Sequence, residues 1–286
     1  MLLESIAAKP PGAGLAGKTA VITGAASGIG LALAGRLKAE RMRVVLVDAD
    51  AEALTAASER LDAKGFTADT RDASAMQALA RDVAGTCGPV HLLCANAGVS
   101  RMAGIKRLSP EDWRWLFDVN LFGAVHTVTA FLPVLAANPD GGQLLITASL
   151  SSLYATRAQA AYAATKYALA AFAETLALEL DAEGSKVAVS LLCPGPVRTN
   201  LGASYARRGA EYRAAAPAAE AEPDIHERAF RAQVEPGDWS TPDEIADLAV
   251  EGLKRGEFWI ITHPQLMGAV EARHRAIAEA VARARP

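Results

Sequence analysis

The sequence has little of what disulfide-stapled domains, metalloproteins and nucleic-acid-binding proteins need. Only three of its 286 residues are cysteines, at the scattered positions 87, 94 and 193, so no disulfide framework is expected. None of them stands in a CxxC pair and the five histidines show no ligand spacing, so no metal site is expected either. Lys and Arg total 29 against 32 Asp and Glu, a net charge of −3, which lacks the basic surface of a nucleic-acid binder.

Long apolar runs are also missing. No run approaches the roughly 20 residues that span a bilayer. The apolar stretch that begins at Met1 is interrupted by Lys9–Gly12. It is therefore too short for a signal peptide. We therefore expect a cytoplasmic protein with no membrane partner. The sequence is nevertheless 51% apolar, which is enough for a large buried core.

Short apolar runs alternate with helical stretches through about residue 192. Because the runs are continuously apolar rather than alternating, they are typical of parallel strands covered on both faces. The order predicts an α/β fold, a single Rossmann-like domain with a doubly wound parallel sheet and helices on both faces. We expect strands at 19–23, 44–47, 66–68, 90–94, 144–148, 187–192 and 258–262, and helices at 29–40, 51–63, 72–86, 110–136, 159–181, from 241 onward, and at 265–283.

Three segments fall outside this alternation. Residues 1–16 read as a loose arm rich in Gly, Pro and Ala. Residues 200–240 have no run long enough for a buried strand, and we expect a partly helical lid over the substrate, since long insertions in compact domains are usually functional. Residues 264–286 read as a charged helical extension. The whole chain, 1–286, is expected to form one domain.

A glycine-rich motif lies between the first predicted strand and the first predicted helix. Glycines permit a tight turn and a close approach of the main chain to a pyrophosphate, and the helix N-terminus attracts phosphate charge. This context favours a dinucleotide site over an ordinary strand-to-helix turn. The residues expected at the cofactor are Thr23, Gly24, Ser27, Gly28, Ile29 and Gly30.

Asp48 ends the second predicted strand, eighteen residues after Gly30. A carboxylate there accepts hydrogen bonds from both ribose hydroxyls of NAD and repels the 2′-phosphate of NADP. The neighbouring Ala25, Ala26 and Ala49 offer no cation for such a phosphate. The alternative is a solvated acid at a strand end, but the glycine motif upstream favours NAD.

Tyr162 and Lys166 stand four residues apart in a predicted helix, on one face. An ammonium near a phenol lowers the phenol's pKa, as does an oxidised nicotinamide, and this prepares a tyrosine for general acid/base catalysis. Ser149 follows a predicted strand thirteen residues earlier, at the ligand edge of an open α/β sheet, where it can bond the substrate oxygen. Spacing alone does not exclude Ser151 or Ser152 for that role.

With these motifs in this order, the chain resembles the short-chain dehydrogenase/reductase family from Lys18 to about Thr262. Thr23–Gly30 fits its TGxxxGIG form, and Asn96-Ala97-Gly98 fits the later part of its NNAG motif, with Ala95 in place of the first asparagine. Ser149, Tyr162 and Lys166 fall at the family spacing. The resemblance assigns further cofactor contacts to Asp69 (adenine) and to the loop residues Pro194, Gly195, Val197 and Thr199.

The resemblance implies a metal-free oxidoreductase that transfers a hydride between NAD(H) and a secondary alcohol or ketone. Tyr162 would be the general acid/base, Lys166 would bind the nicotinamide ribose and lower the pKa of Tyr162, and Ser149 would polarise the carbonyl. Asn120 would connect Lys166 to solvent through a water molecule. The family also implies a homo-oligomer, a dimer or tetramer built on helices 110–136 and 159–181, although core packing explains Trp113 and Trp115 equally well.

The substrate pocket is expected beside the catalytic residues. Its walls would come from Leu150, Leu153, Tyr154, Pro196 and the lid, and their apolar character indicates a hydrophobic alcohol or ketone. Arg157, Arg207 and Arg208 offer charge for a carboxylate, but arginines in an Ala-rich segment are more often solvated. Two alternatives remain open: an NADP-linked biosynthetic ketoreductase, and a catalytically silent dinucleotide-binding sensor or scaffold.

Overall fold

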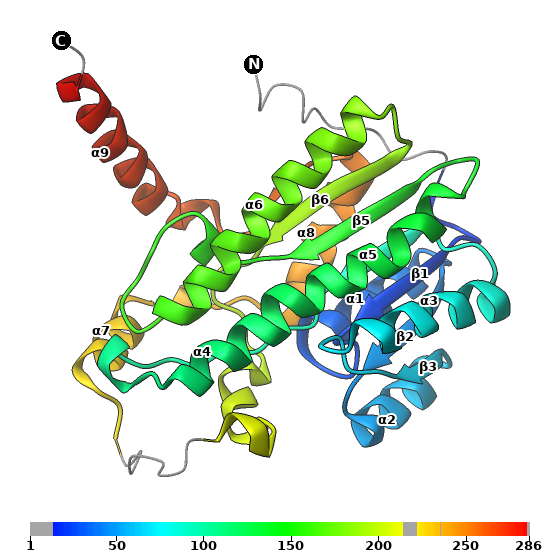
Figure 1. Ribbon diagram of the computed structural model, residues 1–286, viewed down its shortest axis with the longest axis horizontal. Coiled ribbons are helices and arrows are strands. Elements are labelled where there is room, and N and C mark those ends of the chain that lie inside the picture. The colour runs from blue at the N-terminus through cyan, green and yellow to red at the C-terminus, as the bar shows by residue number, and fades with distance from the viewer. Residues whose placement is uncertain (1–13, 214–221, 235, 285–286) are drawn as a thin grey trace.

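The computed structural model describes residues 14–213, 222–234 and 236–284 and is organised around one sheet of seven parallel strands (Figure 1). The strand order is β3-β2-β1-β4-β5-β6-β7, which confirms the predicted α/β fold with a parallel sheet. Most strand residues are buried, as the continuous apolar runs require. The strands are β1 (Thr19–Thr23), β2 (Arg43–Asp48), β3 (Lys64–Thr67), β4 (Leu92–Ala95), β5 (Gly142–Thr147), β6 (Val187–Cys193) and β7 (Trp259–Ile261).

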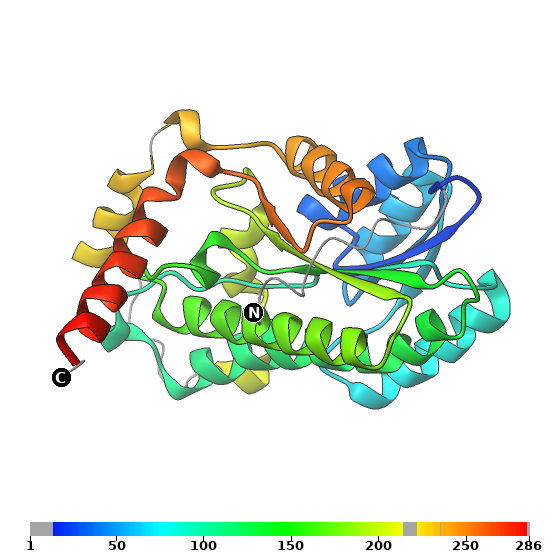
Figure 2. The same ribbon diagram turned by 90° about the horizontal axis from the view of Figure 1, so that it is seen from above.

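Helices cover both faces of the sheet (Figure 2). One face carries α1, α2 and α8, whose apolar side chains pack with Ala20 and Ile22 of β1, and the other carries α3, α5 and α6, which pack with Val21. The alternation of side chains along a strand therefore divides the core into two layers. The helices are α1 (Gly28–Ala39), α2 (Ala51–Leu61), α3 (Ala73–Cys87), α4 (Pro110–Leu116), α5 (Gly123–Ala136), α6 (Ala160–Ala182), α7 (Ile225–Gln233), α8 (Pro242–Arg255) and α9 (Gly268–Ala284).

The predicted helix over 110–136 is one continuous rod, but its hydrogen bonding changes in the middle. It begins at a capping box formed by Ser109 and Asp112, and a π-helical turn, Phe117–Phe122, separates α4 from α5. Such turns are rare and frequently mark functional sites. The rod spans 27 residues and contains a segment of mean hydropathy 1.6, so by length and composition alone it could cross a membrane. In the fold, however, α5 packs along β4, β5 and α3, and its Phe131 and Leu135 are fully buried.

The predicted lid is only partly helical, as expected. Its described residues form a 3₁₀ helix, Asn200–Arg207, a short 3₁₀ turn, Ala210–Tyr212, and α7, whereas residues 214–221 and 235 lie outside the described part. Of the predicted arm, only 14–16 are described. The predicted terminal helix starts at Gly268 after a 3₁₀ turn, Pro264–Leu266, and α9 projects from the body with nearly every residue exposed (Figure 1); residues 285–286 also lie outside the described part.

The topology fixes where a ligand can bind. From β1, the chain adds β2 and then β3 on one side of β1. It then returns and adds β4 on the other side of β1. The connections that follow β1 and β4 therefore diverge to opposite faces and leave a crevice at the carboxyl ends of these strands, which is the usual ligand position in doubly wound sheets.

Candidate active site

A cavity of about 820 Å³ opens at this crevice and continues past the ends of β5 and β6. Most of the predicted site residues line it, although they come from loops distant in sequence. The lining residues among those predicted are Gly24, Ser27, Gly28, Ile29, Asp48, Asp69, Asn96, Ala97, Gly98, Ser149, Leu150, Tyr154, Tyr162, Lys166, Pro194, Gly195, Pro196, Val197 and Thr199.

Three predicted site residues lie behind the wall of the cavity instead. Thr23 is buried at the end of β1, where its Oγ1 accepts the amides of Asn96 at 3.0 Å and Ala97 at 3.3 Å. Gly30 is packed so closely that a Cβ would lie 2.6 Å from Asn96 Nδ2. Asn120 is fully buried in the π-helical turn. Thr23 and Gly30 therefore shape the loop from behind, and their expected place at the cofactor stays a prediction.

The glycine-rich loop has the geometry of a phosphate cradle. Gly24 has φ +65° and Gly28 has φ +54°, in the left-handed region that favours glycine. A Cβ at Gly24 would lie 2.8 Å from Ala97 Cα, so the loop also depends on glycine for close packing. Ser27 precedes α1 in an extended conformation without a side-chain cap, and the amides of the first helical turn remain available for an anion.

Asp48 lines the cavity at the carboxyl end of β2. Its Oδ2 accepts the amide of Ala26 at 3.0 Å and its Oδ1 accepts the amide of Asp50 at 3.0 Å. These bonds orient the carboxylate and tie it to the glycine-rich loop. A carboxylate has about four acceptor positions, so lone pairs remain for two ribose hydroxyls.

Asp69, the predicted adenine contact, is held by Arg71. The Arg71 guanidinium reaches both carboxylate oxygens of Asp69, with Nη2 at 2.6 Å from Oδ2, and its Nη1 lies 2.7 Å from Glu211 of the lid. Although burial opposes the effect, the hydrogen bonds from Arg71 hold the pKa of Asp69 below its usual range. Arg71 thus joins Asp69, on the wall of the cavity, to the lid.

A chain of polar groups connects the glycine-rich loop to Lys166. Asn96 Nδ2 donates to the Thr23 carbonyl at 3.1 Å, and Asn96 Oδ1 accepts from Thr147 Oγ1 at 3.1 Å. The Thr147 carbonyl in turn accepts from Lys166 Nζ at 3.0 Å. This chain fixes the lysine, which is only 3% exposed, at the end of β5.

Asn120 is held from three sides. Its Oδ1 accepts the Val99 amide at 2.8 Å, and its Nδ2 donates to the Val99 carbonyl at 3.0 Å and to Thr165 Oγ1 at 3.1 Å. A Cβ at Gly98 would lie 3.4 Å from Asn120 Oδ1 and 3.6 Å from Lys166 Nζ. The main chain at Gly98 therefore passes between the amide and the ammonium, and a side chain there would crowd both.

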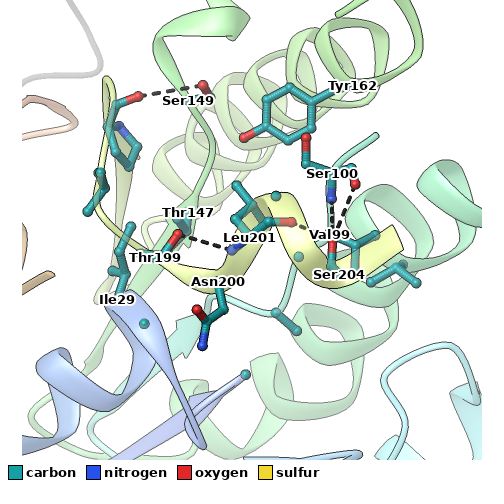
Figure 3. Close-up of a pocket in the computed structure, with 18 of the residues that line it drawn as sticks. Ile29, Val99, Ser100, Thr147, Ser149, Tyr162, Thr199, Asn200, Leu201 and Ser204 are labelled. Atoms are coloured by element: carbon teal, nitrogen blue, oxygen red, sulfur yellow. Dashed lines mark hydrogen bonds between the residues drawn. The ribbon is translucent and has the colours of Figure 1, made fainter. Parts of the chain in front are cut away.

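Tyr162 and Lys166 share the buried face of α6, and Ser149 faces the same cavity (Figure 3). Lys166 Nζ lies 5.6 Å from the centroid of the Tyr162 ring. Burial raises the pKa of Tyr162 to about 12, with a hydrogen bond from Ser149 opposing it. Burial also lowers the pKa of Lys166 to about 8. In the protein alone desolvation therefore dominates the pKa of the phenol, and the expected lowering of that pKa by Lys166 and an oxidised nicotinamide stays a prediction.

The geometry also separates the three candidate serines. Ser149 Oγ accepts the Ser151 amide at 3.0 Å and lies 3.5 Å from the Pro194 carbonyl. Ser151 Oγ instead donates to Gln159 at 2.8 Å, and Ser152 is buried and does not line the cavity. Ser149 is thus the serine beside the Tyr162 hydroxyl.

The loop from Pro194 to Thr199 closes the cavity opposite α6. Val197 forms a parallel bridge with Ser240, and Thr199 Oγ1 caps the next 3₁₀ helix by accepting the Leu201 amide at 3.3 Å. A Cβ at Gly28 would lie 3.4 Å from Thr199 Cγ2. The loop therefore reaches across to the glycine-rich motif, as a segment that encloses a dinucleotide must.

The lid lies over the catalytic residues. Leu201 and Ser204, both in the 3₁₀ helix Asn200–Arg207, face the cavity near Tyr162 (Figure 3). Ser204 Oγ accepts the Ser100 amide at 3.0 Å and lies 3.2 Å from the Ser100 carbonyl. Farther along, Tyr212 donates to Asp118 at 2.7 Å. We call the bonds between Ser204 and the Ser100 main chain the lid latch.

The walls around the catalytic end are mainly apolar. Leu150, Tyr154 and Pro196 line it as predicted, but Leu153 packs into the core beside them and does not. Arg157 is exposed away from the cavity, and Arg208 stacks on the Tyr205 ring at 3.5 Å. The apolar wall also contains Val99, Met102, Trp115, Val119, Leu201, Phe230, Val234, Trp239 and Leu266.

Sequence reasoning missed three polar residues that the site uses. Thr147 is a polar residue at the end of an apolar run, two positions before Ser149. A polar residue at that place in the sequence could have indicated a role in the site. Thr165 stands between Tyr162 and Lys166 but bonds Asn120 rather than a ligand. Ser204 had no local signal, because its partner in the lid latch is 104 residues away.

Comparison with known proteins agrees with this geometry. The chain matches the family model described as short chain dehydrogenase over residues 18–209. 1-Deoxy-11-beta-hydroxypentalenate dehydrogenase of Streptomyces avermitilis is 41% identical over 190 residues, covering 64% of this chain and 70% of that protein. D-beta-hydroxybutyrate dehydrogenase of Cupriavidus necator is 31% identical over 241 residues, covering 82% and 90%. A solved short chain dehydrogenase/reductase from Burkholderia phymatum, in complex with NAD, has a TM-score of 0.84 at 32% identity and covers 92% of this chain and 95% of that chain.

Proposed function

Since this chain belongs to the short-chain dehydrogenase family, and is therefore an oxidoreductase that acts on hydroxyl or keto groups of small molecules, we propose that it is an NAD-dependent dehydrogenase of secondary alcohols. Tyr162 is its general acid/base, and Ser149, Lys166 and Asn120 assist. One observation carries the proposal: the phenol, the serine hydroxyl and the ammonium are buried together beside an apolar pocket.

The residues present fit a dinucleotide. A glycine cradle, uncapped amides at the start of α1 and an oriented carboxylate at Asp48 follow one another along the cavity, in the order phosphate and ribose groups require. Within the described residues, the cations that line the cavity are Arg71, Lys166, Arg207 and Arg208. Arg71 is bonded to Asp69 and Glu211, so the cation closest to the adenine end is neutralised.

This arrangement favours NAD over NADP. A 2′-phosphate beside Asp48 would bring two negative charges together. The likeness to a solved relative in complex with NAD supports the same choice. The alternatives, an NADP-linked ketoreductase and a silent sensor, have no comparable support, because the first needs a free cation near Asp48 and the second has no use for a complete set of proton-transfer groups.

In the proposed reaction, a nicotinamide held in this cavity would supply the hydride chemistry and, when oxidised, positive charge near the phenol. The Tyr162 hydroxyl takes the proton of the alcohol or gives one to the ketone. Ser149 Oγ bonds the substrate oxygen beside it. Lys166, held by the Thr147 carbonyl, favours the ionised phenol and binds the nicotinamide ribose. Asn120 holds the main chain at Val99 and connects Lys166 to solvent.

The pocket indicates the substrate class. Trp115, Leu150, Leu201 and Phe230 make its wall predominantly apolar, and apolar burial gives a ligand most of its affinity. Near them, Gln159 accepts hydroxyl bonds from Ser151 and Thr156 and adds a small polar area. We propose a bulky, hydrophobic secondary alcohol or ketone.

The test is NADH formation from NAD with a panel of secondary alcohols that ranges from small aliphatic to polyol, aromatic and steroid-sized compounds. We expect turnover with hydrophobic members and none with Tyr162→Phe. Equal turnover by Tyr162→Phe would contradict the mechanism. NADH binding without turnover of any alcohol would favour the sensor, and turnover with NADP alone would contradict the cofactor assignment.

We also propose that copies of this chain associate through the α4–α5 rod and α6. Trp115 is 3% exposed and packs with Tyr205 and Tyr212 of its own lid, so it belongs to the core and not to such an interface. Phe122, in the same rod, is 47% exposed and is available to a second copy. Light scattering of the wild type and of Phe122→Glu tests this proposal. The cytoplasmic location stays a prediction.

A further inference from the structure

The loop Pro194–Thr199 has no regular structure, yet it forms the side of the cavity nearest Ser149. One side of the loop is fixed by Ser240, whose amide donates to the Pro196 carbonyl at 3.0 Å and whose carbonyl accepts the Arg198 amide at 2.9 Å. The other side meets His263, the second residue after β7. None of the roles assigned so far uses this histidine.

His263 is 1% exposed and packs directly on Gly195. The Gly195 amide donates to its Nδ1 at 3.1 Å and lies 3.4 Å from Thr262 Oγ1. A Cβ at Gly195 would lie 2.6 Å from the ring Cγ. The glycine and the imidazole therefore fit each other, and any side chain at Gly195 would displace one of them.

The hydrogen bond defines the state of the ring. Nδ1 must carry a lone pair to accept the Gly195 amide at 3.1 Å, and the Thr262 hydroxyl, 2.6 Å from the same atom, can donate to that lone pair as well. With Nδ1 as acceptor the ring is neutral and its proton is on Nε2. Nε2 is buried without a partner of ordinary hydrogen-bond geometry in the described residues. A side chain that only filled space would need no hydrogen-bond acceptor. The Nδ1 acceptor of His263 instead binds the main chain of the loop Pro194–Thr199.

On the basis of the proposed function, we propose that His263 is a positioning residue that holds the Gly195 amide, and with it the loop Pro194–Thr199, against the nicotinamide side of the cavity. Gly195 stands between Pro194, whose carbonyl accepts the Leu150 amide at 2.9 Å, and Pro196. A shift of the Gly195 amide would thus move the loop relative to Ser149, which is also bonded to the Pro194 carbonyl.

Protonation would release this contact, because a proton on Nδ1 removes the acceptor. Burial lowers the pKa of His263, while the carbonyls of Asp238 and Pro196 and the carboxylates of Asp238 and Glu244 oppose the effect. In the unfolded chain, His263 has the ordinary histidine pKa of about 6.5. As the pH falls, the unfolded chain is therefore protonated at a higher pH than the folded chain. The stabilisation is therefore complete above that pH and is lost as the pH falls through the folded-state pKa.

The test compares binding of NADH and of ADP, because ADP lacks the nicotinamide half and Gly195 follows Pro194, whose carbonyl is bonded to Ser149 and Leu150 at the other end of the cavity from Asp48. His263→Phe keeps a ring but loses the acceptor, and we expect about a tenfold weaker Kd for NADH, the effect of one lost buried hydrogen bond, with ADP unchanged. His263→Asn places an amide oxygen near the position of Nδ1 without titrating, and should bind NADH more tightly than His263→Phe.

The matched control is His91→Phe. His91 Nδ1 also accepts a main-chain amide, that of Thr19 at 3.1 Å, and burial also lowers its pKa, but it lies before β4, away from the cavity. This variant should bind NADH and ADP as the wild type does. Wild-type affinity for NADH should also weaken from about pH 7 to pH 5, whereas that of His263→Asn should not.

Two results would overturn the proposal: an unchanged Kd of His263→Phe for NADH, or equal losses for NADH and ADP, which mark general damage to the fold. Parallel pH profiles of wild type and His263→Asn would contradict it as well. The measurement needs no alcohol. Binding of NADH by the wild type tests the proposed cofactor, while the ratio between variants tests the role of His263, so the two can fail separately.

Discussion

The two sides of the cavity are built by different kinds of structure, strand ends on one side and the lid on the other. On one side, Thr147 ends β5, Ser149 follows it closely and Asn96 follows β4, the neighbouring parallel strand, so the register of the sheet fixes their positions. On the other side, the lid touches the body through polar contacts such as the lid latch and the bonds of Tyr212 and Glu211, and through the packing of Trp115 on Tyr205 and Tyr212. The strand side is suited to fixed chemistry, and the lid to opening and to substrate choice.

The largest expected effect lies on the strand side. Tyr162→Phe removes the proton-transfer group, and we expect kcat to fall by about 10²–10⁴-fold, the usual contribution of general acid/base catalysis, with NADH affinity nearly unchanged. Steady-state kinetics with the responding alcohol checks this prediction. Tyr154→Phe is the control, because that phenol lines the same cavity but is half-buried; a comparable loss there would contradict the assignment.

Asp48 comes next on the strand side. Asp48→Ser removes the charged acceptor, and we expect kcat/KM with NAD to fall about 10- to 100-fold, as for lost hydrogen bonds to a charged group, while the ratio of NADP to NAD activity rises. Asp50→Asn is the control, since Asp50 also lines the cavity but caps α2 through the Ala53 amide. An unchanged NADP/NAD ratio in Asp48→Ser would contradict the role of Asp48.

The pH dependence tests the buried phenol directly. Because burial raises the pKa of Tyr162 to about 12 in the protein alone, it is protonated at neutral pH, and the positive charge of oxidised nicotinamide lowers that pKa. Alcohol oxidation, which needs phenolate, should rise with pH up to the value in the complex. Ketone reduction, which needs phenol, should fall above it. Initial rates in both directions from about pH 5 to 10 check this, and a flat oxidation profile would contradict it.

Prediction from sequence was most successful on the strand side. Most strands contain an apolar run, and the carboxyl ends of parallel strands lie on the ligand side of the sheet, so Asp48 and Ser149 could be placed before their distances were known. Asn96 was placed by the family resemblance. Sequence spacing does not distinguish a ligand contact from the layer behind it, and Thr23 and Gly30 lie in that layer.

The lid side could not be predicted to the same depth. Its alanine-rich sequence has weak periodicity, and its positions depend on partners far away in the chain, such as Asp224 with the Gly104 amide at 2.8 Å. The raised pKa of Tyr162 escaped prediction for a related reason. Its sign depends on how completely α6 and the lid remove water from the phenol, which the motif itself does not encode.

The smallest effect should come from the lid latch. Ser204→Ala removes the hydroxyl that accepts the Ser100 amide, and we expect KM for the alcohol to rise about two- to tenfold, the effect of one ordinary hydrogen bond. The change in kcat should be smaller, because Tyr162 and Ser149 keep their strand-side supports. Steady-state kinetics at saturating NAD measures both constants.

Ser100→Ala is the matched control, because the latch uses the main chain of Ser100 and leaves its own hydroxyl out. It should leave KM for the alcohol close to the wild-type value. If both variants raised KM equally, polarity of the wall rather than closure would be the cause. If Ser204→Ala lowered kcat as strongly as Tyr162→Phe, the lid would be part of the chemical machinery, and the division between a fixed strand side and an adjustable lid would be wrong.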